Sequence, residues 1–193
     1  KEYIHIQGGP HTASGGMVDK KLSKTFDNST HYDTASNRAS NLQFMAVSGA
    51  TVEFWMKKDG SDTAKAEKEV IFDLWNGESI TDSTYGRLRL ETRPGPGHAF
   101  VLHWASGSNT QSTNISGDLT KSDVEDGKWH HYAVSIVRSG SAMRSRLYRD
   151  GAIQHEDINS TAGDLISDIN PLAGGLNATI GAMITGSTAT LGG

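Results

Sequence analysis

The sequence contains no cysteine, which excludes disulfide bonds and thiolate metal ligands. No apolar run approaches the length of a membrane span, and no basic-then-apolar leader opens the chain, so we expect no membrane insertion. Acidic residues outnumber basic ones, 22 to 18. The net charge of −4 provides no basic field for nucleic acid, and we expect no nucleic-acid partner. Only 4 prolines accompany 22 glycines, a composition typical of a β-protein with many turns.

Alternation with a period of two is the main pattern that the sequence does contain. In residues 51–57, Val52, Phe54 and Met56 share one face, and residues 86–91, 98–104 and 131–136 alternate in the same way. Each of these segments can bury one face and expose the other, as antiparallel strands do. Residues 69–75 are more continuously apolar and predict an interior strand.

Turn dipeptides separate the predicted strands. Residues 76–77 are Asn-Gly, and residues 126–127 and 150–151 are Asp-Gly, so we expect a tight hairpin at Asp150 and Gly151. Helical signal is limited to a capping-box pattern over residues 122–125. The spacing of the segments predicts an all-β fold, a two-sheet antiparallel β-sandwich with few or no helices.

Five segments, in order, resemble a known family. They are TVEFWMK at 51–57, DGKWHHYAV at 126–134, RLYRDG at 146–151, ATIG at 178–181 and FDNSTHY at 26–32, where Asn28 replaces the usual glycine. These segments are similar to those of laminin G-like domains of the concanavalin A-like lectin/glucanase superfamily. The resemblance implies a jelly-roll sandwich, and we predict one domain over residues 1–193.

The resemblance also implies one more strand after the late Ile-Gly strand. The chain reaches only Gly193, so we expect a piece of a longer protein that lacks this last strand. An unclosed sheet has an edge of unpaired backbone groups. We expect residues 1–7, which alternate at Tyr3-Ile4-His5-Ile6, to cover that edge, or two copies to pair there as a homodimer.

Catalytic patterns are missing. Hydrolases of the superfamily carry three carboxylates on one strand in the pattern E-x-D-x-E or E-x-D-x-x-E. The nearest set here, Glu69, Asp73 and Glu78, lacks the middle carboxylate, and Glu78 falls beyond a turn. His130 and His131 are neighbours on a strand and therefore point to opposite faces, so they cannot hold one metal ion together. We predict that the protein is not an enzyme, with a glycoside hydrolase or lyase as an alternative.

No cofactor is expected, with calcium as an alternative. The late Ile180-Gly181 is followed by no carboxylate, whereas a hard cation requires several oxygen ligands. The remaining oxygen-rich stretch contains Asp73, Asn76 and Asp82.

Outward-facing side chains suggest a ligand-binding face. Aromatic rings with polar neighbours suit carbohydrate, and arginine suits acidic groups. The candidate residues are Trp55, Arg87, Arg89, His103 and Arg146. The alternative is that they are ordinary exposed residues.

The leading interpretation is a non-catalytic recognition or adhesion module that binds carbohydrate or protein. We expect it to belong to a larger extracellular, cell-surface or virion protein such as a phage structural protein. A spacer domain without a ligand is the runner-up.

Overall fold

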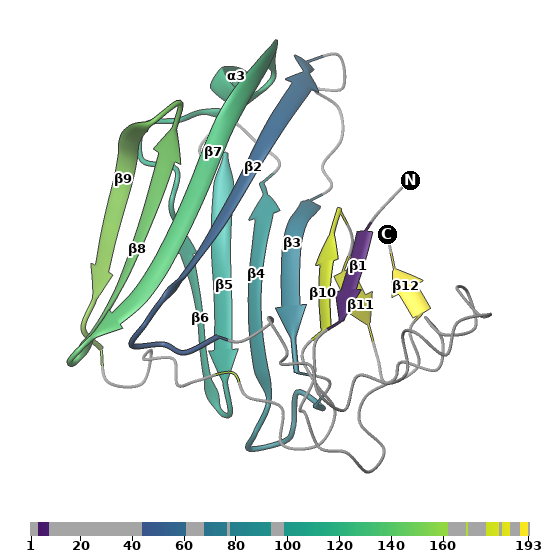
Figure 1. The fold of residues 1–193 in the computed structure, drawn as a ribbon, viewed down its shortest axis with the longest axis vertical. Helices are drawn as coiled ribbons and strands as arrows, with labels where there is room; N and C mark the ends of the chain where they lie inside the picture. The colour runs from purple at the N-terminus through teal and green to yellow at the C-terminus, as the bar shows by residue number, and fades with distance from the viewer. Residues whose placement is uncertain are drawn as a thin grey trace, which may run out of the picture.

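The structure is a computed structural model that describes residues 4–7, 44–60, 68–76, 78–93, 99–161, 169, 177–181, 183–185 and 190–192. Its strands form two antiparallel sheets and a short ribbon (Figure 1). The six-stranded sheet has the order β1 (Ile4–Gln7), β10 (Asn177–Ile180), β3 (Glu69–Trp75), β4 (Gly86–Thr92), β5 (Phe100–Ser106) and β6 (Asn109–Asn114). The four-stranded sheet has the order β2 (Ala50–Asp59), β7 (Asp126–Ser139), β8 (Ala142–Arg149) and β9 (Ala152–Asn159).

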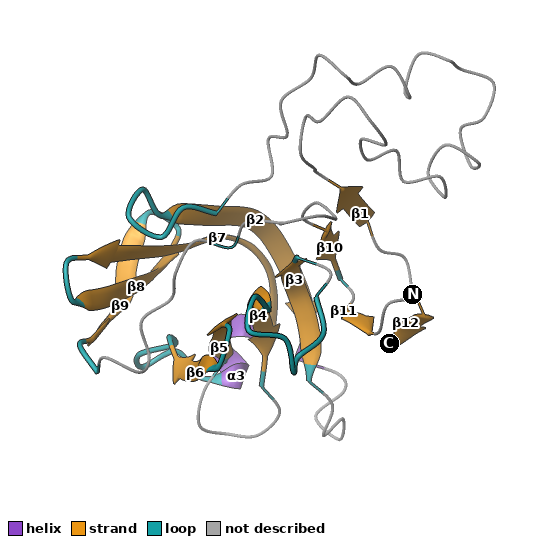
Figure 2. Cartoon of the chain, turned by 90° about the horizontal axis from the view of Figure 1, so that it is seen from below, coloured by secondary structure: helices purple, strands orange, loops and turns teal. Residues whose placement is uncertain are grey.

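The two sheets pack as layers, with β2 and β7 above β4 and β5 in Figure 2. The alternation predicted from the sequence determines which side chains lie between them. Leu88 and Leu90 of β4 are buried beneath Val134 and Ile136 of β7, and Tyr132 contacts Phe100 across the layers with ring centroids 5.2 Å apart. The predicted two-sheet antiparallel β-sandwich is therefore confirmed, and the apolar segment 69–75 forms the interior strand β3, between β10 and β4.

The hairpin predicted at residues 150–151 is confirmed. Asp150 and Gly151 connect β8 to β9 with φ angles of 50° and 82°, which is the left-handed geometry that a two-residue hairpin requires. Asp150 also bonds to the neighbouring strand, because its Oδ1 accepts a hydrogen bond from the His131 amide at 2.9 Å.

The described residues include one short helix, whose cap differs from the predicted one. The helix α3 spans Lys121–Val124, and its N-cap is Thr120 rather than Ser122. The Asp123 carboxylate accepts hydrogen bonds from the Thr120 amide at 2.8 Å and from the Thr120 hydroxyl at 2.6 Å. An aspartate three residues after the cap therefore fills the role that the sequence pattern gave to Glu125.

The N-terminal strand covers the sheet edge, as predicted. Residues 4–7 pair with β10 in the register Ile4 to Ile180 and Gln7 to Asn177. After β10, the strands β11 (Met183–Thr185) and β12 (Thr190–Gly192) pair with each other. The absence of a last strand and the homodimer both stay predictions, and the family-like segment at 26–32 lies outside the described residues.

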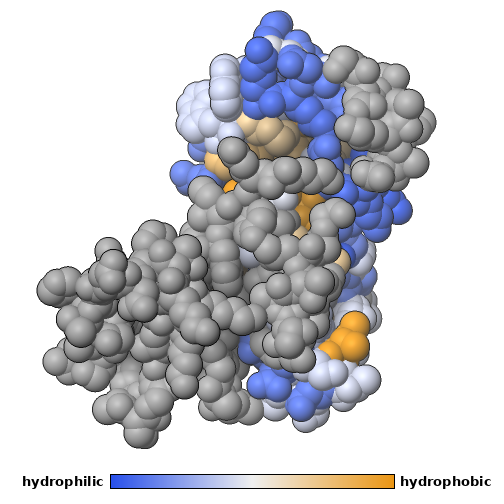
Figure 3. Space-filling model, turned by 90° about the vertical axis from the view of Figure 1, so that its right-hand side faces the viewer, coloured by the Kyte–Doolittle hydropathy of each residue, from blue (hydrophilic) through white to orange (hydrophobic). Residues whose placement is uncertain are grey.

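A cavity of about 350 Å³ opens between the layers where β2 faces β3 and β10. Its walls are mainly apolar and include Val52, Phe54, Phe72 and Ile180. Figure 3 shows apolar residues on this side of the molecule, next to a hydrophilic region. With few convergent polar groups, the cavity is an extension of the core and not a typical ligand site. Within the described ranges, no helix is long and apolar enough to span a membrane.

Candidate functional site

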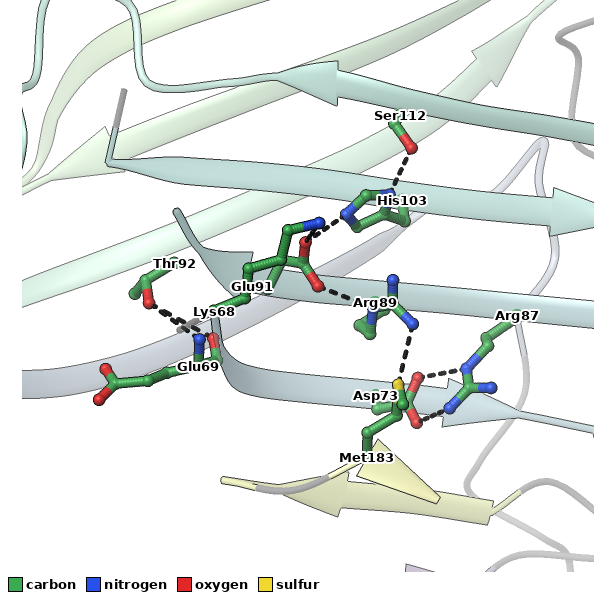
Figure 4. Close-up of polar contacts among 10 residues, drawn as sticks. All are labelled: Lys68, Glu69, Asp73, Arg87, Arg89, Glu91, Thr92, His103, Ser112 and Met183. Carbon is green, nitrogen blue, oxygen red and sulfur yellow. Dashed lines mark hydrogen bonds and ion pairs between the residues drawn. The ribbon is translucent and has the colours of Figure 1, made fainter. Parts of the chain in front are cut away.

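Polar side chains gather on the outer face of the six-stranded sheet. We call this set the polar cluster, and Figure 4 shows it across β3, β4, β5 and β6. The strand register explains the grouping, because Asp73, Arg89, His103 and Ser112 are direct cross-strand neighbours in one row. The cluster consists of Lys68, Asp73, Arg87, Arg89, Glu91, His103 and Ser112.

Arg87 forms a bidentate ion pair with Asp73. Its Nε donates to Asp73 Oδ1 at 2.7 Å, and its Nη2 donates to Oδ2 at 2.5 Å. Asp73 is fully buried, and the Arg87 guanidinium also lies 5.7 Å from the centroid of the Trp75 ring. Desolvation lowers the pKa of Arg87, but the hydrogen bonds and charge of Asp73 outweigh it, so the pKa is raised overall. The fork of Arg87 is thus committed to holding the sheet together.

Arg89 lacks such a partner. Its Nε is buried and makes no hydrogen bond, although Glu91 Oε2 lies 3.1 Å away as an ion-pair partner. Its Nη1 donates to the sulfur of Met183 at 3.0 Å, and a thioether is a weak acceptor. The side chain keeps about a fifth of its surface exposed. Because Arg89 contacts one carboxylate oxygen of Glu91 and a thioether, the exposed part of its guanidinium can still donate to a ligand, whereas the fork of Arg87 is filled by Asp73.

Glu91 lies at the centre of the cations. His103 Nε2 is 2.7 Å from Glu91 Oε1, and Lys68 Nζ is 3.2 Å from the same oxygen. Burial raises the pKa of this carboxyl group, but His103, Arg89 and Lys68 together outweigh burial and lower the pKa to about 2. His103 is fixed in turn by Ser112, which hydrogen-bonds to its Nδ1.

The cluster has more permanent cations than carboxylates. The cations are Lys68, Arg87 and Arg89, and the carboxylates are Asp73 and Glu91. The chain as a whole has a negative net charge. Retaining and inverting glycosidases need one carboxylic acid with a raised pKa. Of the two carboxylates here, Asp73 is held in an ion pair by Arg87, and Glu91 has a lowered pKa.

The structure divides the predicted ligand residues between two sheets. Arg87, Arg89 and His103 come together in the polar cluster, whereas Trp55 and Arg146 lie on the outer face of the four-stranded sheet. Arg146 pairs with Glu156 across β8 and β9. The five residues therefore do not form a single site.

The residues proposed for calcium have structural partners. Asp73 binds Arg87, and the Asn76 side chain donates to the Thr84 carbonyl at 2.7 Å and accepts from the Gly86 amide at 3.0 Å. Asp82 accepts from the Thr84 amide at 2.8 Å, which lowers its pKa. Among the described residues, no three acidic, histidine or cysteine side chains lie close enough together to hold a metal ion. Calcium binding stays a prediction without geometric support.

Sequence reasoning missed Glu91, Lys68 and Ser112. Glu91 continues the alternation of Arg87 and Arg89 and could have been found by following that strand to its end. Lys68 joins the cluster through an ion pair with Glu91, and Ser112 joins it through the pairing of β6 with β5. The sequence of a single strand does not reveal such contacts between strands.

Comparison with known proteins gives a family and remote structural similarities. The family profile described as "Concanavalin A-like lectin/glucanases superfamily" matches residues 27–190. The comparison with curated proteins finds no match.

Among solved structures, the chain is similar to the Ruminococcus gnavus IT-sialidase CBM40, with 13% identity and a TM-score of 0.44, over 100% of this chain and 85% of that one. It is also similar to a Bacillus licheniformis beta-glucanase, with 13% identity and a TM-score of 0.36, over 72% of this chain and 54% of that one. These two similarities are too remote to support a functional argument. The family match spans most of the sandwich, and the chain belongs to the laminin G-like group of the concanavalin A-like lectin/glucanase superfamily.

Proposed function

We propose that this protein is a non-catalytic carbohydrate-binding module and that its polar cluster binds an acidic saccharide. The family includes lectins, which is consistent with this role. The observation that carries the proposal is the contrast between Arg87 and Arg89. The fork of Arg87 is filled by Asp73, whereas the guanidinium of Arg89 contacts one oxygen of Glu91 and the sulfur of Met183 and stays about a fifth exposed. A carboxylate or sulfate group on a sugar would accept hydrogen bonds from the exposed part of the Arg89 guanidinium.

The surroundings of Arg89 favour an anionic ligand over a neutral one. Lys68 and His103 lie around the same carboxylate of Glu91, so a ligand anion near Arg89 meets a local excess of positive charge. The Ser112 hydroxyl group, which hydrogen-bonds to His103, provides a polar atom in the same cluster for a sugar hydroxyl group. Such a role fits an extracellular, cell-surface or virion location, which we include in the proposal.

A glycan array that contains both acidic and neutral saccharides, run with calcium and again with EDTA, tests the ligand class. We expect binding to sialylated, uronate or sulfated glycans in both conditions. Binding that requires calcium would contradict a metal-independent site and favour an oxygen-ligand site. Absence of binding would favour a protein ligand or a spacer role.

The variant Arg89→Ala tests the site. It should weaken binding of the best acidic glycan by at least about tenfold, the loss of roughly one charge-assisted hydrogen bond. Arg89→Lys should restore only part of the affinity, because lysine retains the charge but not the fork. Arg146→Ala is the matched control, since it removes an arginine that pairs with Glu156 on the other sheet. Equal effects of Arg89→Ala and Arg146→Ala would overturn the assignment.

A further inference from the structure

The outer face of the four-stranded sheet carries two exposed tryptophans. Trp55 of β2 is 65% exposed and Trp129 of β7 is 64% exposed, whereas Trp75 and Trp104 are buried. In the register of β2 and β7, Trp55 faces His131 and Trp129 faces Lys57, so the two indoles are diagonal neighbours. We call Trp55, Trp129, His131, Glu53 and Lys57 the indole platform.

The platform is held by regular sheet structure. β2 and β7 pair without a break from Ala50 to Lys57, which fixes the outward direction of these side chains. The Trp55 and His131 rings contact each other, with centroids 5.3 Å apart and an interplanar angle of 48°. The indoles therefore stand on a rigid strand pair, so little conformational entropy is lost when a ligand binds.

The size of the platform argues against a stable protein interface. Two indoles that are about two-thirds exposed offer roughly 250 Å² of apolar surface, well below the roughly 800 Å² that each partner contributes to a typical protein interface. Charged side chains border this apolar surface, because Glu53 and Lys57 flank Trp55 on the same face of β2. This pattern of flat aromatic faces next to donors and acceptors matches the two sides of a sugar ring, which has apolar C–H faces and a rim of hydroxyl groups.

The charges of the platform favour an uncharged sugar. Glu53 and Lys57 have opposite signs, and Glu53 lies 3.8 Å from His131 Nε2. Among the platform residues, the charges of Glu53 and Lys57 balance, in contrast to the polar cluster. We infer that the indole platform is a second carbohydrate-binding surface, which stacks neutral pyranose rings on Trp55 and Trp129. This inference rests on the proposed function for the class of ligand but involves a different sheet.

Intrinsic fluorescence tests the platform directly, because only two of the four tryptophans are accessible to a soluble quencher. Acrylamide quenching of the full chain would be measured with cello-, laminari-, manno-, xylo- and malto-oligosaccharides. We expect at least one of them to protect the accessible tryptophans. Trp55→Ala and Trp129→Ala should each weaken that binding by about tenfold or more, as aromatic anchors do.

Ile80→Ala is the matched control, since Ile80 is 72% exposed but lies outside the platform. Circular dichroism confirms that each variant is folded. Loss of neutral-sugar binding in the tryptophan variants, but not in Arg89→Ala, would support two separate surfaces.

Three results would overturn the inference. They are the absence of protection by any of the five oligosaccharides, protection by zwitterionic lipid vesicles alone, and self-association that buries the indoles without sugar. Failure of the proposed function is a different result, namely loss of acidic-glycan binding from the array while neutral oligosaccharides still protect the indoles.

Discussion

On the outer face of the six-stranded sheet, arginine, histidine and carboxylate side chains bind one another, whereas on the outer face of the four-stranded sheet two indoles stand in solvent. Both faces arise from the same alternation of apolar and other residues along their strands. The polar cluster is buried enough for its charges to affect stability as well as binding, while the indole platform is exposed enough that its side chains are available at little structural cost. A polar pattern in sequence can thus mean either a stabilising network or a free surface.

Arg87→Ala should produce the largest effect on stability. It removes the bidentate partner of Asp73, a carboxylate with no exposed surface, and breaking a buried pair of this kind costs about 3 kcal/mol. Urea unfolding measures the change in the free energy of unfolding. Arg89→Ala should cost clearly less, because Arg89 makes no bidentate pair. Equal losses for the two variants would remove the distinction between a structural and a ligand-binding arginine.

Glu91 should make stability depend on acid pH. Its pKa falls from 4.5 to about 2 on folding, so its stabilising effect is complete above pH 4.5 and is lost as the pH falls from about 4.5 toward 2. A shift of this size corresponds to about 3 kcal/mol at most. Because Lys68 is half exposed and its charge is screened by solvent, we expect a loss of roughly 2 kcal/mol. Glu91→Gln should flatten this part of the pH profile of the unfolding midpoint. An unchanged slope would show that other carboxylates cause the acid sensitivity.

His130 should act in the opposite pH direction. Its Nδ1 lies 2.6 Å from Asp150 Oδ2 and its Nε2 lies 3.0 Å from Asp126 Oδ2, and these partners raise its pKa above 6.5. The stabilisation is therefore complete below pH 6.5 and is lost as the pH rises through the higher pKa of the folded state. The pair is near the surface, so we expect about 0.5 kcal/mol. NMR titration of the His130 ring measures its pKa. Thermal unfolding of the protein and of His130→Gln across this pH range measures the contribution to stability.

Trp55→Thr should have the smallest effect on stability. Because the indole is two-thirds exposed and threonine suits a strand, the free energy of unfolding should change by less than about 0.5 kcal/mol. A loss comparable to that of Arg87→Ala would mean that Trp55 is a packing residue, and the indole platform would then be a structural feature.

The sequence was sufficient to predict the strands but not to predict which residues form the site. Alternation at Val52, Phe54 and Met56 correctly predicted which side of β2 is buried, and Asp150-Gly151 correctly predicted a hairpin. The same alternation placed Trp55 and Arg89 together as outward residues, although they belong to different sheets. Strand pairing is a long-range property, because a period of two determines a face but not the sheet to which it belongs. The cap of α3 was missed because Thr120-Asp123 and Ser122-Glu125 carry overlapping versions of one pattern.

The pairing of β1 with β10 has a consequence for how the chain acquires its structure. Residues near one end of the sequence contact residues near the other, as in the pair Ile4 and Ile180, so this ladder closes a loop of nearly the whole chain. Such distant contacts are slow to form, since the closure entropy is lost before the contact provides any stabilisation. During synthesis on a ribosome, β3 emerges long before β10, so the edge of β3 that pairs with β10 stays unpaired until β10 has been made. The time between those two events is when this protein is most exposed to misassembly with another strand.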